Sequence, residues 1–225
     1  MTMKPFDAVM FDLDGTLIET APEIADAVNL TLHEVGLNTV TQQQVNDWIG
    51  HGTLELLIQA LAYTQSVSDQ QVRDSAALAG ISATFNKHYQ ACCGTRSYLY
   101  PQVRETLNAL RELDVRLAVV TNKESRFTQT VLDAHSLTAL FDVVVSGDTL
   151  PVKKPNPAGI EHCLKRFNTT RERSLFVGDS SIDIATARNA KVAVWALPYG
   201  YNMGEPIERA QPDRVIEDIS ALLAA

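Results

Sequence analysis

The sequence predicts an α/β protein in which a parallel sheet is interrupted by an inserted helical block. Short apolar runs typical of buried strands alternate with helical patterns along most of the chain, as in parallel α/β sheets. These runs are residues 7–11, 116–120, 142–146, 174–178, 192–196 and, more weakly, 214–216. About 75 residues after the first run show no strand pattern, and this length exceeds that of a simple crossover. We therefore expect a helical lobe above the strand ends.

The predicted helices rest on apolar residues at three- and four-residue spacing. After the inserted block, the stripes are Val103, Leu107 and Leu110, and then Ile160, Cys163, Leu164 and Phe167. Within the block, they are Ile24, Val28, Leu32 and Val35; Leu54, Leu57, Ile58 and Leu61; and Val72, Ala76, Ala79 and Ala83. Thr20-Ala-Pro-Glu23 is typical of a capping box with proline in the first turn, so the first of these helices should start there.

Composition excludes several classes of protein. The 225 residues are 45% apolar and 20% charged, which is ordinary for a globular chain. No apolar stretch approaches the roughly 20 residues that span a bilayer, and we expect no signal peptide. The net charge of −8 without a basic run argues against nucleic acid or a membrane surface as partner. Three cysteines, two of them adjacent (Cys92 and Cys93), fit reduced thiols in a cytoplasm better than a disulfide framework.

The first strand ends in two closely spaced carboxylates, Asp12 and Asp14, followed by Gly15 and Thr16. Carboxylates at i and i+2 on extended backbone point the same way, about 7 Å apart. Two such charges at one place are unfavourable unless a cation lies between them, so the pattern indicates a divalent metal and a carboxylate able to attack a substrate. The alternative, an Asp-Gly turn, accounts for Gly15 but not for Asp12.

Two further motifs follow later strands, and each also has a purely structural interpretation. Thr121-Asn122-Lys-Glu124 fits a capping box, but a hydroxyl and free amides at a helix start also suit a phosphate oxygen. Lys153 and Lys154 precede Pro155-Asn156-Pro157, where Asn156 and Pro157 can start a helix. A lysine held there offers a fixed positive charge to phosphate, and the pattern does not decide which of the two points inward.

A last motif, Gly178-Asp179-Ser180-Ser-Ile-Asp183, follows a strongly apolar strand. Ser180 and Asp183 are a plausible capping pair, whereas Asp179 lies at a strand end like Asp12. Mg²⁺ prefers a few oxygen ligands and water. Asp12, Asp179 and the backbone carbonyl of Asp14 would supply that set.

Together, Asp12-Leu-Asp14-Gly-Thr, Thr121-Asn122, Lys154-Pro-Asn-Pro and Gly178-Asp179 through Asp183 resemble the four motifs of the haloacid dehalogenase-like hydrolases. The resemblance covers essentially the whole chain. It implies a Rossmann-like core of parallel strands with helices on both faces, formed by residues 1–18 and 98–225, and an all-helical cap at residues 19–97. It also implies Asp12 as nucleophile, Asp14 as general acid/base, Thr121 and Lys154 as phosphate-handling residues, and Asp179, supported by Asp183, as the Mg²⁺ ligand of the last motif.

Within that family, residues 48–52, 199–204 and 212–215 resemble the members that hydrolyse 2-phosphoglycolate, although His51 stands where Asn is more usual. Gly50 and Gly52 would let backbone amides approach a small anion, or would form a helix-to-helix turn. The predicted substrate contacts are Gly15, Thr16, Gly50, His51, Gly52 and Asn122. The predicted partner is a small phosphate ester, bound by a monomer or homodimer.

Four other functions are compatible with the same fold. A phosphosugar mutase would return the phosphoryl group to a sugar, and a phosphatase could act on another small ester. A dehalogenase would need neither a metal nor a second carboxylate, so Asp14 and Asp179 argue against it. A non-catalytic binding protein would be expected to have lost one of the four catalytic positions, yet all are present.

Overall fold

The computed structural model describes residues 6–224 and contains a six-stranded sheet in the order β5-β4-β1-β6-β7-β8, with all strands parallel. The strands are β1 (Ala8–Phe11), β4 (Arg116–Val120), β5 (Val143–Val145), β6 (Ser174–Gly178), β7 (Ala193–Ala196) and β8 (Arg214–Val215). Both ends of each strand lie within one residue of the ends of a run that was predicted as a strand. The α/β fold class and the parallel sheet are therefore confirmed.

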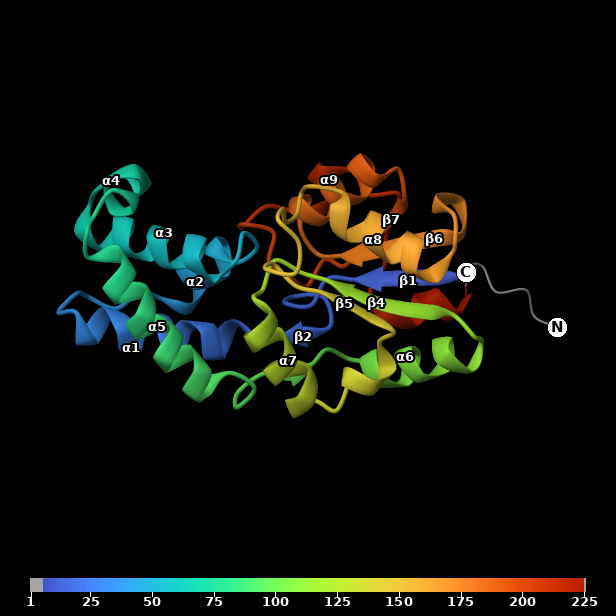
Figure 1. Ribbon diagram of the computed structural model, residues 1–225, viewed down its shortest axis with the longest axis horizontal. Coiled ribbons are helices and arrows are strands. Elements are labelled where there is room, and N and C mark those ends of the chain that lie inside the picture. The colour runs from blue at the N-terminus through green and yellow to red at the C-terminus, as the bar shows by residue number, and fades with distance from the viewer. Residues whose placement is uncertain (1–5, 225) are drawn as a thin grey trace.

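Helices cover both faces of the sheet (Figure 1). One face carries α6 (Val103–Glu112) and α7 (Ser125–Ala134), and the other carries α8 (Ala158–Phe167) and α9 (Ser181–Ala190). Side chains alternate between the two cores along each strand, as a pleated sheet requires: Val9 and Phe11 lie in one core and Met10 in the other. Short 3₁₀ helices complete the chain at η1 (Thr138–Leu140), η2 (Arg171–Arg173), η3 (Ile207–Ala210) and η4 (Ile219–Ala224).

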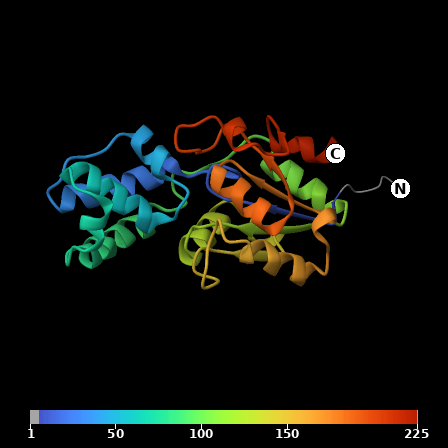
Figure 2. The same cartoon turned by 90° about the horizontal axis from the view of Figure 1, so that it is seen from above.

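Five of the helices between β1 and β4 lie together beyond the carboxyl ends of the strands (Figures 1 and 2). They are α1 (Ala21–Glu34), α2 (Gln42–Trp48), α3 (Thr53–Gln65), α4 (Asp69–Arg73) and α5 (Leu78–Cys92), and we call them the helical insertion. The chain enters and leaves it through a small antiparallel pair, β2 (Ile18–Glu19) with β3 (Tyr98–Leu99). Strands of two residues are too short to show an alternating pattern, which is why the sequence did not reveal them.

The start of α1 differs from the predicted capping box. Pro22 lies in the first turn as expected, but Thr20 makes no side-chain cap and its hydroxyl donates to Asp14 Oδ1 at 2.6 Å. The carboxylate of Glu23 is fully buried, and its Oε2 accepts backbone N–H groups of Gly94, Arg96 and Ser97. Both polar side chains therefore connect the helical insertion to other segments instead of capping the helix.

The prediction of a single helix with an apolar stripe of Val72, Ala76, Ala79 and Ala83 was wrong. The chain breaks between α4 and α5, and the three alanines are exposed. The buried face of α5 is formed by Phe85 and Tyr89, whose rings lie 5.6 Å apart. Aromatic side chains bury far more apolar area than alanine, so they determine the orientation of the helix.

No helix among residues 6–224 has the length and apolar character required to cross a lipid bilayer.

We predict that Glu23→Ala lowers the free energy of unfolding by about 3 kcal/mol, because three backbone N–H groups lose a charged acceptor. Urea unfolding followed by circular dichroism measures the change. The matched control is Glu34→Ala on the same helix, whose exposed carboxylate pairs with His88 and should cost less than about 0.5 kcal/mol. Equal losses in the two variants would contradict this account of Glu23.

Candidate active site

Asp12 follows the central strand β1 and is buried, with 8% of its surface exposed. Lys154 Nζ lies 2.7 Å from Asp12 Oδ1 and 2.7 Å from Asp183 Oδ1, so one ammonium serves two carboxylates. Beyond that ion pair, the described part of the chain offers the Asp12 carboxylate no hydrogen-bond donor. Asp12 is therefore held by one cation and retains free lone pairs.

The lysine pair, which the sequence left undecided, is resolved by the structure. Lys154 is 5% exposed and reaches the carboxylates, whereas the exposed Lys153 donates from Nζ to the backbone oxygen of His51 at 2.7 Å. Asn122 fixes the backbone of Lys154 through two hydrogen bonds, one in each direction. Lys154 is therefore the lysine of this site.

Asp14 lies two residues beyond Asp12 and has different partners. Its Oδ1 accepts from Thr20 Oγ1 at 2.6 Å and lies 2.9 Å from Lys123 Nζ. Lys123 is 2% exposed; burial lowers its pKa, but the adjacent Asp14 carboxylate raises it, and the net shift is upward. The two aspartates of the first motif are thus paired with two different lysines.

Asp179, at the end of β6, is enclosed by three segments of the chain. Thr16 Oγ1 donates to its Oδ1 at 2.5 Å, and the backbone N–H of Tyr201 donates to its Oδ2 at 2.6 Å. Gly15 adopts φ +82°, and any Cβ there would overlap the Asp179 carboxylate. The glycine of the first motif therefore lets the turn after β1 approach the Asp179 side chain closely.

Asp183 lies on the first turn of α9 and is fully buried. Its Oδ2 accepts the backbone N–H groups of Asp179 and Ser180 and the hydroxyl of Ser180. Ser180 in turn accepts the N–H of Asp183, so the capping pair predicted from the sequence is confirmed. These bonds fix the position of Asp179 relative to α9.

Ligand oxygens of Asp12, Asp179 and Asp183 lie within 4.8 Å of one another. Four carboxylates, including Asp14, face two ammonium groups, which leaves two negative charges in a buried site. Burial raises the pKa of Asp12 to about 7 and, together with Asp183 and Asp12, raises that of Asp179 well above its usual value. A divalent cation with oxygen ligands fits this donor set and this charge. Asp183 is the most fully occupied of the three, with three hydrogen bonds to its Oδ2 and Lys154 at its Oδ1. Asp12, Asp179 and the Asp14 carbonyl therefore remain our predicted ligands.

The motif after β4 does not form the predicted capping box. Helix α7 begins only at Ser125, and Glu124 occupies its N-cap position without a side-chain cap. The Thr121 hydroxyl oxygen accepts the N–H of Lys123 at 3.2 Å, which leaves its own hydrogen available. The substrate contact of Asn122 stays a prediction, and its side-chain amide already binds Gly50 and Lys154.

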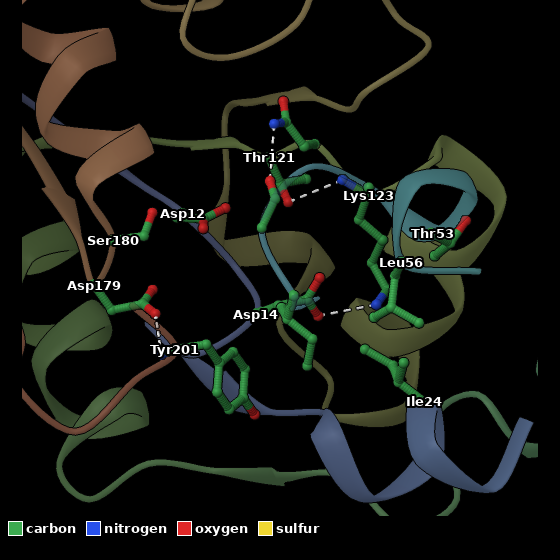
Figure 3. A pocket seen from close by; sticks show the side chains of 14 residues that line it. Asp12, Asp14, Ile24, Thr53, Leu56, Thr121, Lys123, Asp179, Ser180 and Tyr201 are labelled. Carbon is green, nitrogen blue, oxygen red and sulfur yellow. Dashed lines mark hydrogen bonds and ion pairs between the residues drawn. The ribbon is translucent and has the colours of Figure 1, made fainter. Parts of the chain in front are cut away.

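A pocket opens between these strand ends and the helical insertion (Figure 3). We call it the central pocket. It is lined by Asp12, Asp14, Ile24, Ile49, Gly50, Gly52, Thr53, Leu56, Thr121, Asn122, Lys123, Asp179, Ser180 and Tyr201. Gly50 and Gly52 are thus at the pocket as expected. The exposed His51 side chain instead lines a separate surface hollow with Glu55 and Lys153.

Three polar residues of the pocket were not singled out by the sequence. Lys123 was counted only as part of a capping box, although its position directly after Thr121-Asn122 was a signal. Tyr201 lay in a segment noted for resemblance alone, yet its hydroxyl accepts the backbone N–H groups of Thr20 and Ala21. Thr53, at the start of α3, donates to Glu124 Oε1 at 2.7 Å and connects the insertion to the core.

Comparisons with known proteins agree with this geometry. A family model of haloacid dehalogenase-like hydrolases matches residues 9–197. The chain is 41% identical to the phosphoglycolate phosphatase of Aliivibrio fischeri, covering 96% of this chain and 94% of that protein. It is 38% identical to the phosphoglycolate phosphatase of Vibrio cholerae, covering 98% and 97%. A crystal structure from Haemophilus somnus, described as a predicted phosphoglycolate phosphatase, superimposes with a TM-score of 0.92 at 35% identity, over 99% and 98% of the two chains.

The raised pKa of Asp12 predicts a pH effect on stability in metal-free buffer. Between about pH 4 and 7 the folded protein binds more protons at this carboxyl than the unfolded chain does, so its contribution to stability falls as the pH rises. Asp12→Asn cannot ionise, and its free energy of unfolding relative to wild type should increase by roughly 1 kcal/mol per pH unit from pH 5 to 7. Urea titrations at several pH values measure this difference. A difference between Asp12→Asn and wild type that does not change with pH would contradict the raised pKa.

Proposed function

We propose that this chain, which belongs to the haloacid dehalogenase-like hydrolases and is a phosphoric monoester hydrolase, converts 2-phosphoglycolate to glycolate and phosphate. The observation that carries the proposal is the pair of aspartates after β1, which are paired with two different lysines. The relatives at 41% and 38% identity are named phosphoglycolate phosphatases, and the match covers nearly their whole length. This similarity supports the choice of substrate.

Asp12 is our proposed nucleophile. It has free carboxylate lone pairs facing the central pocket, and Lys154 offsets part of its charge without covering the whole carboxylate. Attack of Asp12 on phosphorus would form an aspartyl-phosphate and break the bond to the glycolate oxygen. Lys154 and the Thr121 hydroxyl would bind the phosphoryl oxygens as charge shifts onto them.

Asp14 is our proposed general acid and then general base. It lies two residues from the nucleophile and lines the same pocket, so it can protonate the departing glycolate oxygen. In the second step it would accept a proton from the water that attacks the aspartyl-phosphate. The Thr20 hydroxyl and Lys123 hold one oxygen of Asp14, which keeps the other available for this proton transfer.

Asp12, Asp179 and the backbone carbonyl of Asp14 would hold Mg²⁺. When bound, the ion would neutralise phosphoryl charge and orient the phosphate for in-line attack. The hydroxyl of Thr16 and the N–H of Tyr201 orient Asp179 toward this position.

We also infer that residues 19–97 form a cap over a core of residues 1–18 and 98–225, with residues 1–5 and 225 outside the described part of the chain. The two-stranded β2–β3 link supports this division, and so do Gly50, Gly52, Thr53 and Leu56, which bring the insertion to the pocket. A cap that closes over bound ester would exclude bulk water from the aspartyl-phosphate.

The test of the substrate is a panel of small phosphate esters compared by kcat/KM, with phosphate release and sugar isomerisation both measured. We expect 2-phosphoglycolate to rank first and no isomerised sugar phosphate to form. Asp12→Asn should lower kcat at least 1,000-fold, because the amide cannot attack phosphorus. Asp69→Asn, on the surface of α4, should match wild type. A panel led by a sugar phosphate, or near-normal turnover by Asp12→Asn, would refute the proposal.

The metal assignment predicts that Mg²⁺ raises the melting temperature of the protein, because binding to the folded state alone stabilises it. A shift of several degrees at saturating Mg²⁺ is expected for wild type and should disappear in Asp179→Asn. Differential scanning fluorimetry with and without EDTA measures it independently of turnover. The same shift in both proteins would exclude Asp179 as a ligand.

The acid role of Asp14 predicts a dependence on the leaving group. Asp14→Asn should reduce kcat/KM for 2-phosphoglycolate about 100-fold or more, since an alkoxide leaves poorly without a proton. With p-nitrophenyl phosphate, whose phenolate needs no protonation, the same variant should release the first equivalent of nitrophenol rapidly and then stall. Stopped-flow absorbance measures this burst. Equal losses on both substrates without a burst would contradict the assignment.

A further inference from the structure

Among the described residues that line the central pocket, Lys123 is the one that carries a positive charge. Lys154, the other lysine of the site, is not among the residues that line the pocket, and its ammonium is shared between Asp12 and Asp183. Lys123 reaches the pocket from the loop after β4, and its side chain is almost fully buried. It is therefore positioned to contact the part of a substrate that lies on the Asp14 side of the phosphate.

The ammonium of Lys123 is held on two sides and open on a third. Its Nζ lies 2.9 Å from Asp14 Oδ1 and donates to the hydroxyl of Tyr89, with the Tyr89 ring centroid 5.0 Å away. An ammonium has three N–H donors, and within residues 6–224 the third has no acceptor. A buried donor of this kind normally has a partner, so an acceptor from the substrate is the natural one.

The walls around Lys123 are apolar. Ile24, Ile49 and Leu56 line the same pocket as Lys123, and Figure 3 draws Ile24 and Leu56 on the side of the pocket where the ammonium lies. In such surroundings a charge-assisted hydrogen bond is stronger than in water, and no second cation of the lining competes for an anion.

The distance from Asp14 sets the size of the group that Lys123 could bind. Asp14 would contact the ester oxygen that leaves, and Lys123 Nζ lies 2.9 Å from the same carboxylate. In the ester of a 2-hydroxy acid, the carboxylate oxygens lie about 3 Å from the ester oxygen. One substrate can therefore touch Asp14 through the ester oxygen and Lys123 through a carboxylate, both at hydrogen-bond distance.

We propose that Lys123, positioned by the Tyr89 hydroxyl, binds the carboxylate of the leaving group and selects phosphate esters of short hydroxy acids. This assignment rests on the proposed function, because it requires a phosphatase whose leaving group is glycolate or a close relative. Tyr89 belongs to α5, so the selecting lysine is oriented by the helical insertion while its backbone belongs to the core.

The test compares two substrates that differ in one charge: 2-phosphoglycolate and 2-hydroxyethyl phosphate. Wild type should prefer the former by 10- to 100-fold in kcat/KM, the range expected of one charge-assisted contact. Lys123→Met should lose most of this preference while still hydrolysing 2-hydroxyethyl phosphate. Because disturbance of Asp14 would slow both substrates alike, the ratio isolates recognition of the carboxylate. The control Lys165→Met, on the exposed surface of α8, should keep the wild-type ratio.

Tyr89→Phe keeps the positive charge of Lys123 and removes the hydroxyl to which its Nζ donates. This variant tests the role of Lys123 if Lys123→Met does not fold. We expect the preference to fall about threefold, since Nζ loses one of its two fixed acceptors. Wild type that prefers 2-hydroxyethyl phosphate would overturn the proposed function itself. Wild type that prefers 2-phosphoglycolate, with the preference unchanged in Lys123→Met or, failing that, in Tyr89→Phe, would overturn only the role of Lys123.

Discussion

The repulsion among four carboxylates, three of them buried, is the constraint on which the rest of this structure depends. Asp12, Asp14, Asp179 and Asp183 lie at the carboxyl ends of β1 and β6, where, among the described residues, the cations paired with them are Lys123 and Lys154. Desolvation makes that excess charge costly, and it is tolerated where function requires a bound cation. The same imbalance leaves Asp12 with a free oxygen, which links the electrostatics to the proposed chemistry.

The topology of the sheet explains how the charges come together. Strand β1 lies in the middle, paired with β4 on one side and β6 on the other, so three chain segments distant in sequence end at one place. Ligand sites in open α/β sheets form at such strand ends. The helical insertion then adds the apolar wall and the turn at Gly50–Gly52, so the chemistry resides in the core and the enclosure comes from the insertion.

Prediction from the sequence was accurate where the signal was local. Six apolar runs located six strands, and Asp12 and Asp179, singled out because each follows a buried strand, line one pocket. It failed where side chains chose distant partners. Thr20 binds Asp14 and Glu23 binds the 94–97 backbone, although both fitted a local capping box. Lys123 follows Thr121-Asn122 directly, but its place in the site depends on Tyr89 and Asp14, which folding brings to it across 34 and 109 residues. Such long-range contacts leave no periodic trace in the chain.

The central claim is that Asp12 carries the phosphoryl group. The most direct measurement is a rapid acid quench during turnover, followed by borohydride reduction and mass spectrometry of the peptide containing residue 12. Borohydride reduces an acyl phosphate to an alcohol, so the account predicts that Asp12 becomes homoserine, in proportion to the phosphoenzyme present. Asp12 recovered unmodified while another residue carries the phosphate would contradict it.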